Sequence, residues 1–246
     1  MKLDQSNIQA IILVGGKGTR LKNLISDRPK PMAEVMGKPF LEWIIVALRK
    51  QGIHKIILAV SHLKEIIKDY FQDGALLNVN ISYSEELSPL NTGGAILHAL
   101  EKVNGNHFFV LNGDSYCAWD LHSLVEKQKT SKSLVTLSLI RKSNVERYGT
   151  VVIDKKGEVL CFKEKVENPK KGGWINSGIY FFDKDCFTLS PFRGNFSLEK
   201  DFLPFWVRKN RVYSVINNTN IFLDIGIPDD YLKAEKLLKK EFKTFI

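Results

Sequence analysis

The sequence predicts an α/β fold in which a mixed, mostly parallel sheet lies between layers of helices. Apolar runs rich in β-branched residues alternate with amphipathic segments, at a spacing that favours strand–helix–strand units with right-handed crossovers. A glycine-rich segment also follows the first strand, at the sheet edge where such folds bind ligands. The predicted buried strands are 11–14, 55–60, 79–84, 107–112 and 134–140, and the predicted helices are 40–51, 63–71, 95–103 and 121–130.

From about residue 141 the pattern changes to short strands joined by polar turns, which is typical of antiparallel pairing. No linker-like composition divides the chain. We therefore expect residues 1–246 to form one domain, in which about residues 141–200 include a small antiparallel lid over the carboxyl edge of the sheet. The strands predicted in this part are 149–153, 159–164 and 174–182.

Length and composition are those of an ordinary globular protein. The 246 residues are 44% hydrophobic and 26% charged, and the three cysteines are widely spaced with no C-x-x-C pair, which favours reduced thiols in a cytoplasmic protein. The N-terminus is polar, and no apolar run approaches the roughly 18 residues of a membrane span. We therefore expect a cytoplasmic location and no membrane partner.

The net charge of +9 admits nucleic acid, an anionic membrane surface or small polyanionic substrates. Part of the excess lies in the last predicted helix, where a solvated face is the simplest account. The remainder is scattered and does not form the basic stripe with interleaved aromatic residues that is typical of nucleic-acid surfaces. Small phosphorylated substrates are favoured, and no nucleic-acid partner is expected.

The segment after the first strand has the composition of a phosphate-binding loop. Residues 15–18 read Gly-Gly-Lys-Gly, which lets backbone N–H groups approach a ligand closely. Arg20 and Lys30 add cationic charge, and Pro31, which follows Lys30, biases it toward extended backbone. A glycine-rich turn with solvated basic residues is the structural alternative. A Walker loop needs Ser or Thr where Gly18 stands, and the dinucleotide fingerprint needs glycine where Leu21 stands, so both are excluded.

The order G-G-x-G-T-R-L followed by P-K-P resembles the signature of the sugar-1-phosphate nucleotidyltransferases, or nucleotide-sugar pyrophosphorylases. The resemblance implies a Rossmann-like three-layer sandwich of the glycosyltransferase-A type. It also implies transfer of a nucleotidyl group from a nucleoside triphosphate to a sugar 1-phosphate, with release of pyrophosphate. Further matches cover essentially the whole chain: N-T-G-G-A from residue 91, G-D from 113, F-K-E-K from 162, N-S-G-I-Y from 176 and D-I-G-I-P-D-D-Y from 224.

The resemblance places the nucleotide against the glycine-rich loop and against a second loop, residues 88–94, that contacts base and ribose. Family members usually carry glycine where this chain has Asn91, a residue that tolerates left-handed backbone better than other non-glycine residues. A helix start with nearby glycines is the structural alternative for this loop. The nucleotide-binding residues implied are Leu13, Gly15, Gly16, Gly18, Thr19, Asn91, Thr92, Gly93, Asn112 and Gly113.

Two carboxylates at the ends of predicted strands, Asp114 and Asp224, are candidate metal ligands. The resemblance implies that both bind Mg²⁺, whereas their spacing in the sequence does not show that they meet. Because the reaction brings a dianion toward a polyanion, catalysis would rest on positioning and charge neutralisation without a protein nucleophile. The resemblance assigns Arg20 to the leaving pyrophosphate and Lys30 to the α-phosphoryl oxygens.

The sugar phosphate is expected at the antiparallel strands. By resemblance, Glu164 would contact sugar hydroxyls and Lys165 would hold the phosphate. Asn176 would face the sugar from the strand that also carries Gly178, and Glu199 would close the pocket. A solvated strand end, for the lysine-rich motif, and a helix N-cap with acidic first-turn residues, for Glu199, are the structural alternatives.

Within the family, P-K-P-M, T-G-G-A, S-L-E-x-D and D-I-G-x-P-x-D-Y are together most similar to guanylyltransferases that act on D-glycero-α-D-manno-heptose 1-phosphate. Those enzymes make GDP-heptose for bacterial surface polysaccharide, so GTP and that sugar phosphate are the expected partners. Mannose 1-phosphate guanylyltransferase and hexose 1-phosphate uridylyl- or thymidylyltransferases are the alternatives. A non-catalytic sugar-nucleotide-binding regulatory protein is an alternative of another class. A homodimer is compatible with the sequence, which leaves the oligomeric state open.

Overall fold

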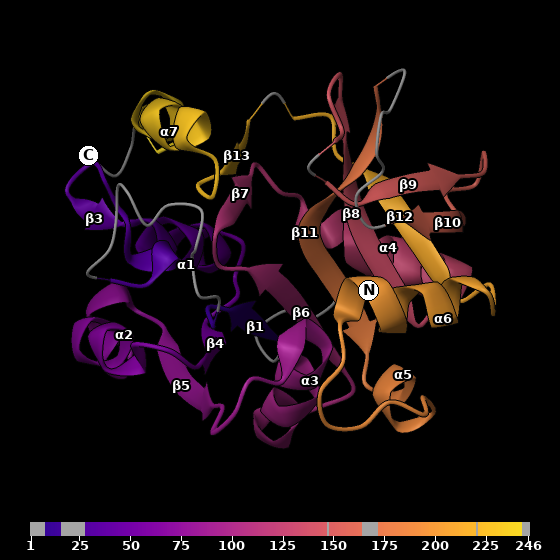
Figure 1. The fold of residues 1–246 in the computed structure, drawn as a ribbon, viewed down its shortest axis with the longest axis horizontal. Coiled ribbons are helices and arrows are strands. Elements are labelled where there is room, and N and C mark those ends of the chain that lie inside the picture. The colour runs from indigo at the N-terminus through magenta and orange to yellow at the C-terminus, as the bar shows by residue number, and fades with distance from the viewer. Residues whose placement is uncertain (1–7, 16–27, 147, 164–171, 220, 243–246) are drawn as a thin grey trace.

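The computed structural model describes residues 8–15, 28–146, 148–163, 172–219 and 221–242. In these residues a nine-stranded sheet runs in the order β10-β9-β11-β6-β1-β4-β5, with β8 paired to β11 and β12 paired to β8. Helices cover both faces, which confirms the expected mixed three-layer α/β fold. Figure 1 shows β5 between helices α2 and α3, while β8, β9, β10 and β12 lie at the opposite side of the molecule.

The parallel part of the sheet is built on β1 (Gln9–Leu13), which pairs in parallel with β4 (Lys55–Val60) on one side and β6 (His107–Asn112) on the other. β5 (Asn80–Glu85) pairs in parallel with β4. These apolar strands are almost entirely buried, as their runs of β-branched residues predict. Since they run in the same direction, their carboxyl ends meet at one edge of the sheet.

The antiparallel strands join this sheet through β11 (Gly173–Asp183), which pairs with β8 along both of its halves. On its other side, the first half of β11 pairs with β9 and the second half pairs with β6. The register shifts between Asn176 and Tyr180, and Gly178 within this shift has φ +78°, as expected for glycine at a bulge. β12 was missed by the sequence pattern. The other strands here are β8 (Val135–Lys142), β9 (Thr150–Ile153), β10 (Val159–Lys163) and β12 (Val212–Ile216).

Two short antiparallel pairs lie outside the main sheet. β7 (Ser115–Cys117) pairs with β13 (Phe222–Asp224), and β2 (Glu34–Val35) pairs with β3 (Lys38–Pro39). The first pair matters for the site, because it aligns Asp224 with Ser115. It thereby brings the two candidate metal ligands together from distant parts of the chain.

Alternation along the strands divides the buried side chains into two apolar cores. Phe109 and Phe181 lie in one core, with residues of helices α1, α2, α4 and α7. Phe108 and Phe182 lie in the other, with residues of α3, α5 and α6. The helices are α1 (Phe40–Lys50), α2 (Lys64–Phe71), α3 (Asn91–Ala99), α4 (Leu121–Ser131), α5 (Asp185–Thr188), α6 (Leu203–Val207) and α7 (Pro228–Glu241).

The three cysteines are free, as their spacing predicts. Among the described residues, no helix combines the length and the apolar character that crossing a membrane requires. Short helical turns complete the fold: 3-10 helices η3 (Lys30–Met32), η4 (Ala75–Leu77) and η5 (Leu100–Lys102), and a π-helix η6 (Leu198–Phe202).

Candidate active site

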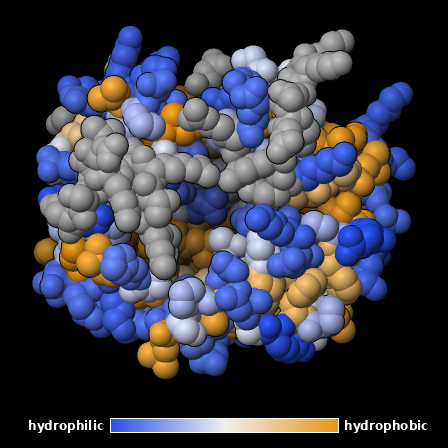
Figure 2. Space-filling view, viewed as in Figure 1, coloured by the Kyte–Doolittle hydropathy of each residue, from blue (hydrophilic) through white to orange (hydrophobic). Residues whose placement is uncertain are grey.

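A pocket of about 710 Å³ lies at the carboxyl edge of the parallel strands. Figure 2, in the orientation of Figure 1, shows a hollow with hydrophobic surface near the centre of this face. The pocket gathers residues from the ends of β1, β4, β5 and β6 and from helix α3 and η6: Leu13, Gly15, Ala59, Ser61, His62, Glu86, Leu87, Ser88, Pro89, Asn91, Thr92, Ala95, Asn112, Asp114 and Glu199.

The structure brings Lys30, Asp114 and Asp224 into one cluster. Lys30 Nζ lies 2.7 Å from Asp114 Oδ2 and 3.8 Å from Asp224 Oδ1. The N–H of Ile225 donates to the Asp114 carbonyl oxygen at 3.0 Å, which extends the β7–β13 pair to the aspartates. Burial and the neighbouring Asp114 carboxylate raise the pKa of Asp224, and the ammonium of Lys30 opposes them. Lys30 is thus the counter-ion of both carboxylates.

The backbone at Lys30 differs from the sequence prediction. The following proline predicts an extended residue, but Lys30 begins the 3-10 helix η3. Two hydrogen bonds close this turn, from Met32 N–H to Pro29 O at 2.8 Å and from Ala33 N–H to Lys30 O at 3.0 Å. These bonds overcome the local bias against helical backbone before proline. The prediction of an extended Lys30 was therefore wrong.

Gly226 leaves the space that Lys30 occupies. A Cβ built on Gly226 would collide with Lys30 Nζ and would lie 2.8 Å from Asp224 Oδ1. Gly226 is not among the glycines with positive φ, so its backbone does not demand glycine. Glycine at this position is instead explained by the space that the Lys30 ammonium needs between the two aspartates.

Close backbone approaches set the position of the predicted nucleotide-binding residues. A Cβ on Gly113 would lie 2.7 Å from Leu13 O, and Gly113 N–H donates to the same oxygen at 2.9 Å. A Cβ on Gly178 would lie 2.6 Å from Asn112 Nδ2. Both glycines thus let the carboxyl ends of β1 and β6 and the bulge of β11 converge beside Asp114.

The second half of the other predicted loop, residues 91–94, forms the first turn of α3. Asn91 has φ +57°, which confirms the expected left-handed backbone. The Thr92 hydroxyl donates to Glu199 Oε2 at 2.7 Å, so two predicted site residues are joined. Gly93 N–H donates to Phe196 O at 3.0 Å, and a Cβ there would collide with the Phe196 ring. This glycine is explained by contact with the η6 region.

Asn176 is engaged within its own strand. Its Nδ2 donates to the Tyr180 hydroxyl at 2.5 Å, and its Oδ1 accepts from Gly178 N–H at 3.1 Å. The side chain thus spans the bulge of β11, and its contact with a sugar stays a prediction.

Six other predicted site residues lie outside the described residues: Gly16, Gly18, Thr19, Arg20, Glu164 and Lys165.

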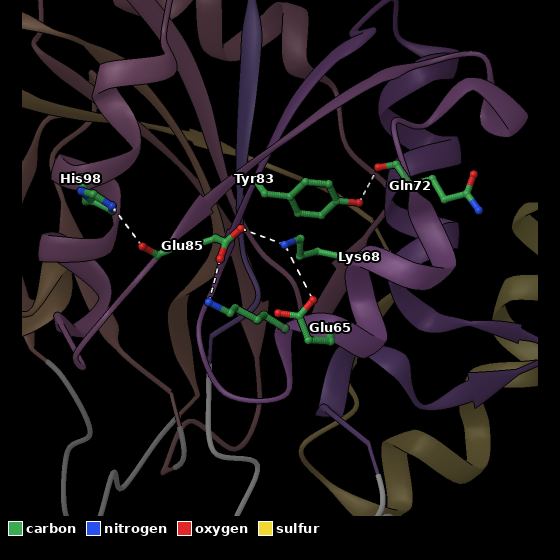
Figure 3. Close-up of polar contacts among 7 residues, drawn as sticks. Glu65, Lys68, Gln72, Tyr83, Glu85 and His98 are labelled. Atoms are coloured by element: carbon green, nitrogen blue, oxygen red, sulfur yellow. Dashed lines mark hydrogen bonds and ion pairs between the residues drawn. The ribbon is translucent and has the colours of Figure 1, made fainter.

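The sequence reasoning missed Glu86, although this acidic residue directly follows β5 at the ligand-binding edge. Its Oε2 accepts from Leu90 N–H at 3.0 Å. The preceding Glu85 accepts from Lys64 at 2.7 Å and from Lys68 at 3.0 Å, both on α2, and its carbonyl oxygen lies 3.2 Å from His98 Nε2 on α3. Figure 3 shows Glu85 held between these two helices.

The aspartates fit a hard divalent cation, because carboxylate oxygens are its preferred protein ligands. Two carboxylates are few, and in the part of the chain that the structure describes no group of three or more His, Cys, Asp or Glu could hold a metal ion. Mg²⁺ characteristically completes its shell with water and substrate phosphates. The pair therefore suits an ion that arrives with a phosphorylated substrate.

The fold and this edge define an α/β protein with paired aspartates at the carboxyl edge of its parallel strands. The family model described as "Nucleotidyl transferase" matches residues 9–241. The chain therefore belongs to the nucleotidyl transferase family.

Several relatives and solved structures are similar over nearly full length. D-glycero-α-D-manno-heptose 1-phosphate guanylyltransferase of Campylobacter jejuni is 46% identical over 91% of this chain and 97% of its own. The protein of the same description from Aneurinibacillus thermoaerophilus is 41% identical over 94% and 99%. The crystal structure of HddC from Yersinia pseudotuberculosis complexed with GMP-PN superposes with a TM-score of 0.81 at 36% identity, covering 94% of this chain and all of that one.

Proposed function

We propose that the protein transfers a guanylyl group from GTP to D-glycero-α-D-manno-heptose 1-phosphate, giving GDP-heptose and pyrophosphate for surface polysaccharide. The observation that carries nucleotidyl transfer is the Asp114–Lys30–Asp224 cluster beside a nucleotide-sized pocket. The heptose and the guanine are supported by the two guanylyltransferases of that description, which match almost end to end.

To catalyse this nucleotidyl transfer, the protein mainly has to position two anionic substrates and neutralise their charge. Mg²⁺ held by Asp114 and Asp224 would neutralise charge on the triphosphate. Lys30 has its ammonium beside the same carboxylates, so it is placed to shift toward an α-phosphoryl oxygen once a cation compensates them. A point charge near the transferred group stabilises charge that develops in the transition state.

The remaining roles are proposals carried by the motif resemblance. Arg20 would hold the leaving pyrophosphate together with the amides of the glycine-rich loop. Glu164 and Lys165 would bind the sugar phosphate, with Asn176 facing the sugar. The proposed single domain, homodimer and cytoplasmic location are separate expectations, of which the homodimer is tested by sedimentation of the purified chain.

A non-catalytic regulatory protein is the competing function. It would not need the Lys30 ammonium poised between two carboxylates, and this arrangement favours an enzyme. The test is a matrix of GTP, ATP, UTP and dTTP against heptose, mannose and glucose 1-phosphates, scored by pyrophosphate release. Highest kcat/KM for GTP with the manno-configured heptose is expected. Release with no pair would favour a regulatory protein, and a preference for another pair would reassign the substrate. An Asp114→Asn variant is the inactive control.

A further inference from the structure

The motif that begins at Asp224 continues past this proposed metal ligand into helix α7, where none of the proposed roles falls. Ile227 N–H donates to the Asp224 carbonyl oxygen at 2.9 Å, and Pro228 is the first residue of the helix. A proline and acidic residues at a helix start are explained by the fixed φ of proline and by the helix dipole. Neither reason applies to Tyr231, an aromatic residue in the same turn.

Tyr231 connects helix α7 to the β2–β3 hairpin. Its hydroxyl donates to the Glu34 carbonyl oxygen at 2.8 Å, across 197 positions of the sequence. Its N–H donates to the Ile227 carbonyl oxygen at 3.0 Å, so the residue also belongs to the first turn of the helix. Burial and the charge of Glu34 raise the pKa of the Tyr231 phenol, against the charge of Arg28. The hydroxyl therefore keeps its proton and remains a donor at neutral pH.

The β2–β3 hairpin follows directly on the helical turn that carries Lys30. Ala33, the residue before β2, donates its N–H to the Lys30 carbonyl oxygen at 3.0 Å. Within the hairpin, the Val35 carbonyl oxygen accepts from the buried Trp43 Nε1–H at 2.9 Å. The hairpin is thus held by helix α1 at Val35 and by helix α7 at Glu34. Figure 1 shows α7 between β3 and β13.

Helix α7 therefore contacts both parts of the cluster formed by Lys30 and the aspartates. At its first turn, Asp230 Oδ2 accepts from Asp224 N–H at 3.4 Å, and Tyr231 holds the hairpin that follows Lys30. Lys30 Nζ lies 3.8 Å from Asp224 Oδ1, although the two residues are far apart in the sequence. Because a displacement of about 1 Å in a positioned catalytic group can slow a reaction by up to roughly 100-fold, such contacts matter for turnover.

We propose that Tyr231 is a positioning residue, whose hydroxyl holds the β2–β3 hairpin and thereby keeps the Lys30 ammonium in place. This inference rests on the proposed function, in which Lys30 acts on the transferred phosphoryl group. Tyr231 is not among the described residues that line the pocket. Its effect on turnover must therefore pass through the hairpin and Lys30, which distinguishes it from a residue that contacts a substrate.

The test removes the hydroxyl alone, by Tyr231→Phe in the wild type and in the Lys30→Ala variant. In the wild type, kcat should fall roughly 3- to 10-fold, the range that loss of one neutral hydrogen bond allows. KM for GTP should stay nearly unchanged. In Lys30→Ala the same substitution should leave kcat nearly unchanged, because the charge that Tyr231 positions is already absent.

Tyr83→Phe is the matched control. It also removes a phenol hydroxyl that donates to a backbone carbonyl oxygen, that of Gln72 at 2.6 Å (Figure 3). Tyr83 lies on β5, away from the hairpin, so kcat should be unchanged by this substitution in both backgrounds. A normal kcat in Tyr231→Phe would overturn the inference. Equal losses with and without Lys30 would also overturn it, since Tyr231 would then act independently of the lysine.

A second measurement separates this inference from the proposed function, because it needs no substrate. Amide hydrogen exchange of residues 30–40 should be faster in Tyr231→Phe than in the wild type or in Tyr83→Phe, since the hairpin loses one of its contacts. Unchanged exchange there would overturn the inference. If the wild type released pyrophosphate with no substrate pair, the proposed function would be wrong, whereas faster exchange would still support the role of Tyr231 in holding the hairpin.

Discussion

At the scale of single residues, the site is defined by a cation between two carboxylates. Lys30 is largely buried, with 14% of its side chain exposed, and such a charge is tolerated only when paired. Its partners come from two other segments of the chain, and Gly226 leaves it room. Lys30 and the two proposed metal ligands are therefore one electrostatic unit, whose members should not respond independently to substitution.

Lys30→Ala should lower kcat a few-hundred-fold, equivalent to about 3–4 kcal/mol, because it removes charge stabilisation at the transferred phosphoryl group. Binding of GTP should change little, since the interaction strengthens in the transition state. Steady-state kinetics and calorimetric GTP binding check both statements. Normal turnover by this variant would contradict the mechanism.

Gly226→Ala should lower kcat through Lys30, because the added methyl group collides with the ammonium. The double variant Lys30→Ala/Gly226→Ala should lose less than the sum of the two single losses, since the ammonium that the methyl displaces is already absent while the contact with Asp224 remains. Kinetics of the two single variants and the double variant form the cycle. Additive losses would show that Gly226 acts independently of Lys30.

At the scale of elements, helix α3 and the π-helix η6 are joined at the mouth of the pocket. Leu198 N–H donates to the Thr92 hydroxyl at 2.9 Å, and that hydroxyl donates to Glu199. Ser197 caps η6 by accepting from Lys200 N–H. Glu199 therefore lines the pocket and belongs to a capped helical turn. Its contact with a sugar stays a prediction.

The substitution Gly93→Ala distinguishes a packing role of this glycine from direct contact with the nucleotide. Because a methyl group would collide with the Phe196 ring, we expect a loss of about 1–3 kcal/mol in the free energy of unfolding, as for other overpacked sites. Denaturant unfolding measures this loss, with Ala95→Gly as a size-matched change in the same helix that removes a methyl group without a collision. A raised KM for GTP at unchanged stability would instead support direct nucleotide binding by Gly93.

At the scale of the whole molecule, β11 connects the parallel strands, whose edge carries the pocket, to the antiparallel strands, where the sugar phosphate is expected. It pairs with β8 along both of its halves, with β6 after the bulge at Gly178 and with β9 before it. A strand shared in this way fixes the distance between the proposed phosphate-binding edge and the antiparallel strands. The expected sugar-phosphate residues follow β10 on the antiparallel side.

Lys165→Ala should raise KM for the sugar phosphate much more than KM for GTP, because the lysine is assigned to the incoming phosphate alone. Full initial-rate kinetics with both substrates varied provides the measurement. Lys155→Ala, in the turn between β9 and β10, is the matched control and should change neither KM. Equal losses for both substrates with Lys165→Ala would indicate a structural role for this segment.

The sequence alone determined the alternating strands and helices, because burial and periodicity are local properties. The predicted bounds of β4 and β6 agree with the structure, and the motifs selected Asp114 and Asp224. Tertiary structure alone decided that these aspartates share Lys30, which is 84 residues from Asp114 in the chain. It also decided that Glu86, a plain acidic residue in the sequence, faces the pocket. These contacts between distant residues depend on the order of the strands in the sheet and on the short β7–β13 pair. Neither feature leaves a periodic signal in the sequence.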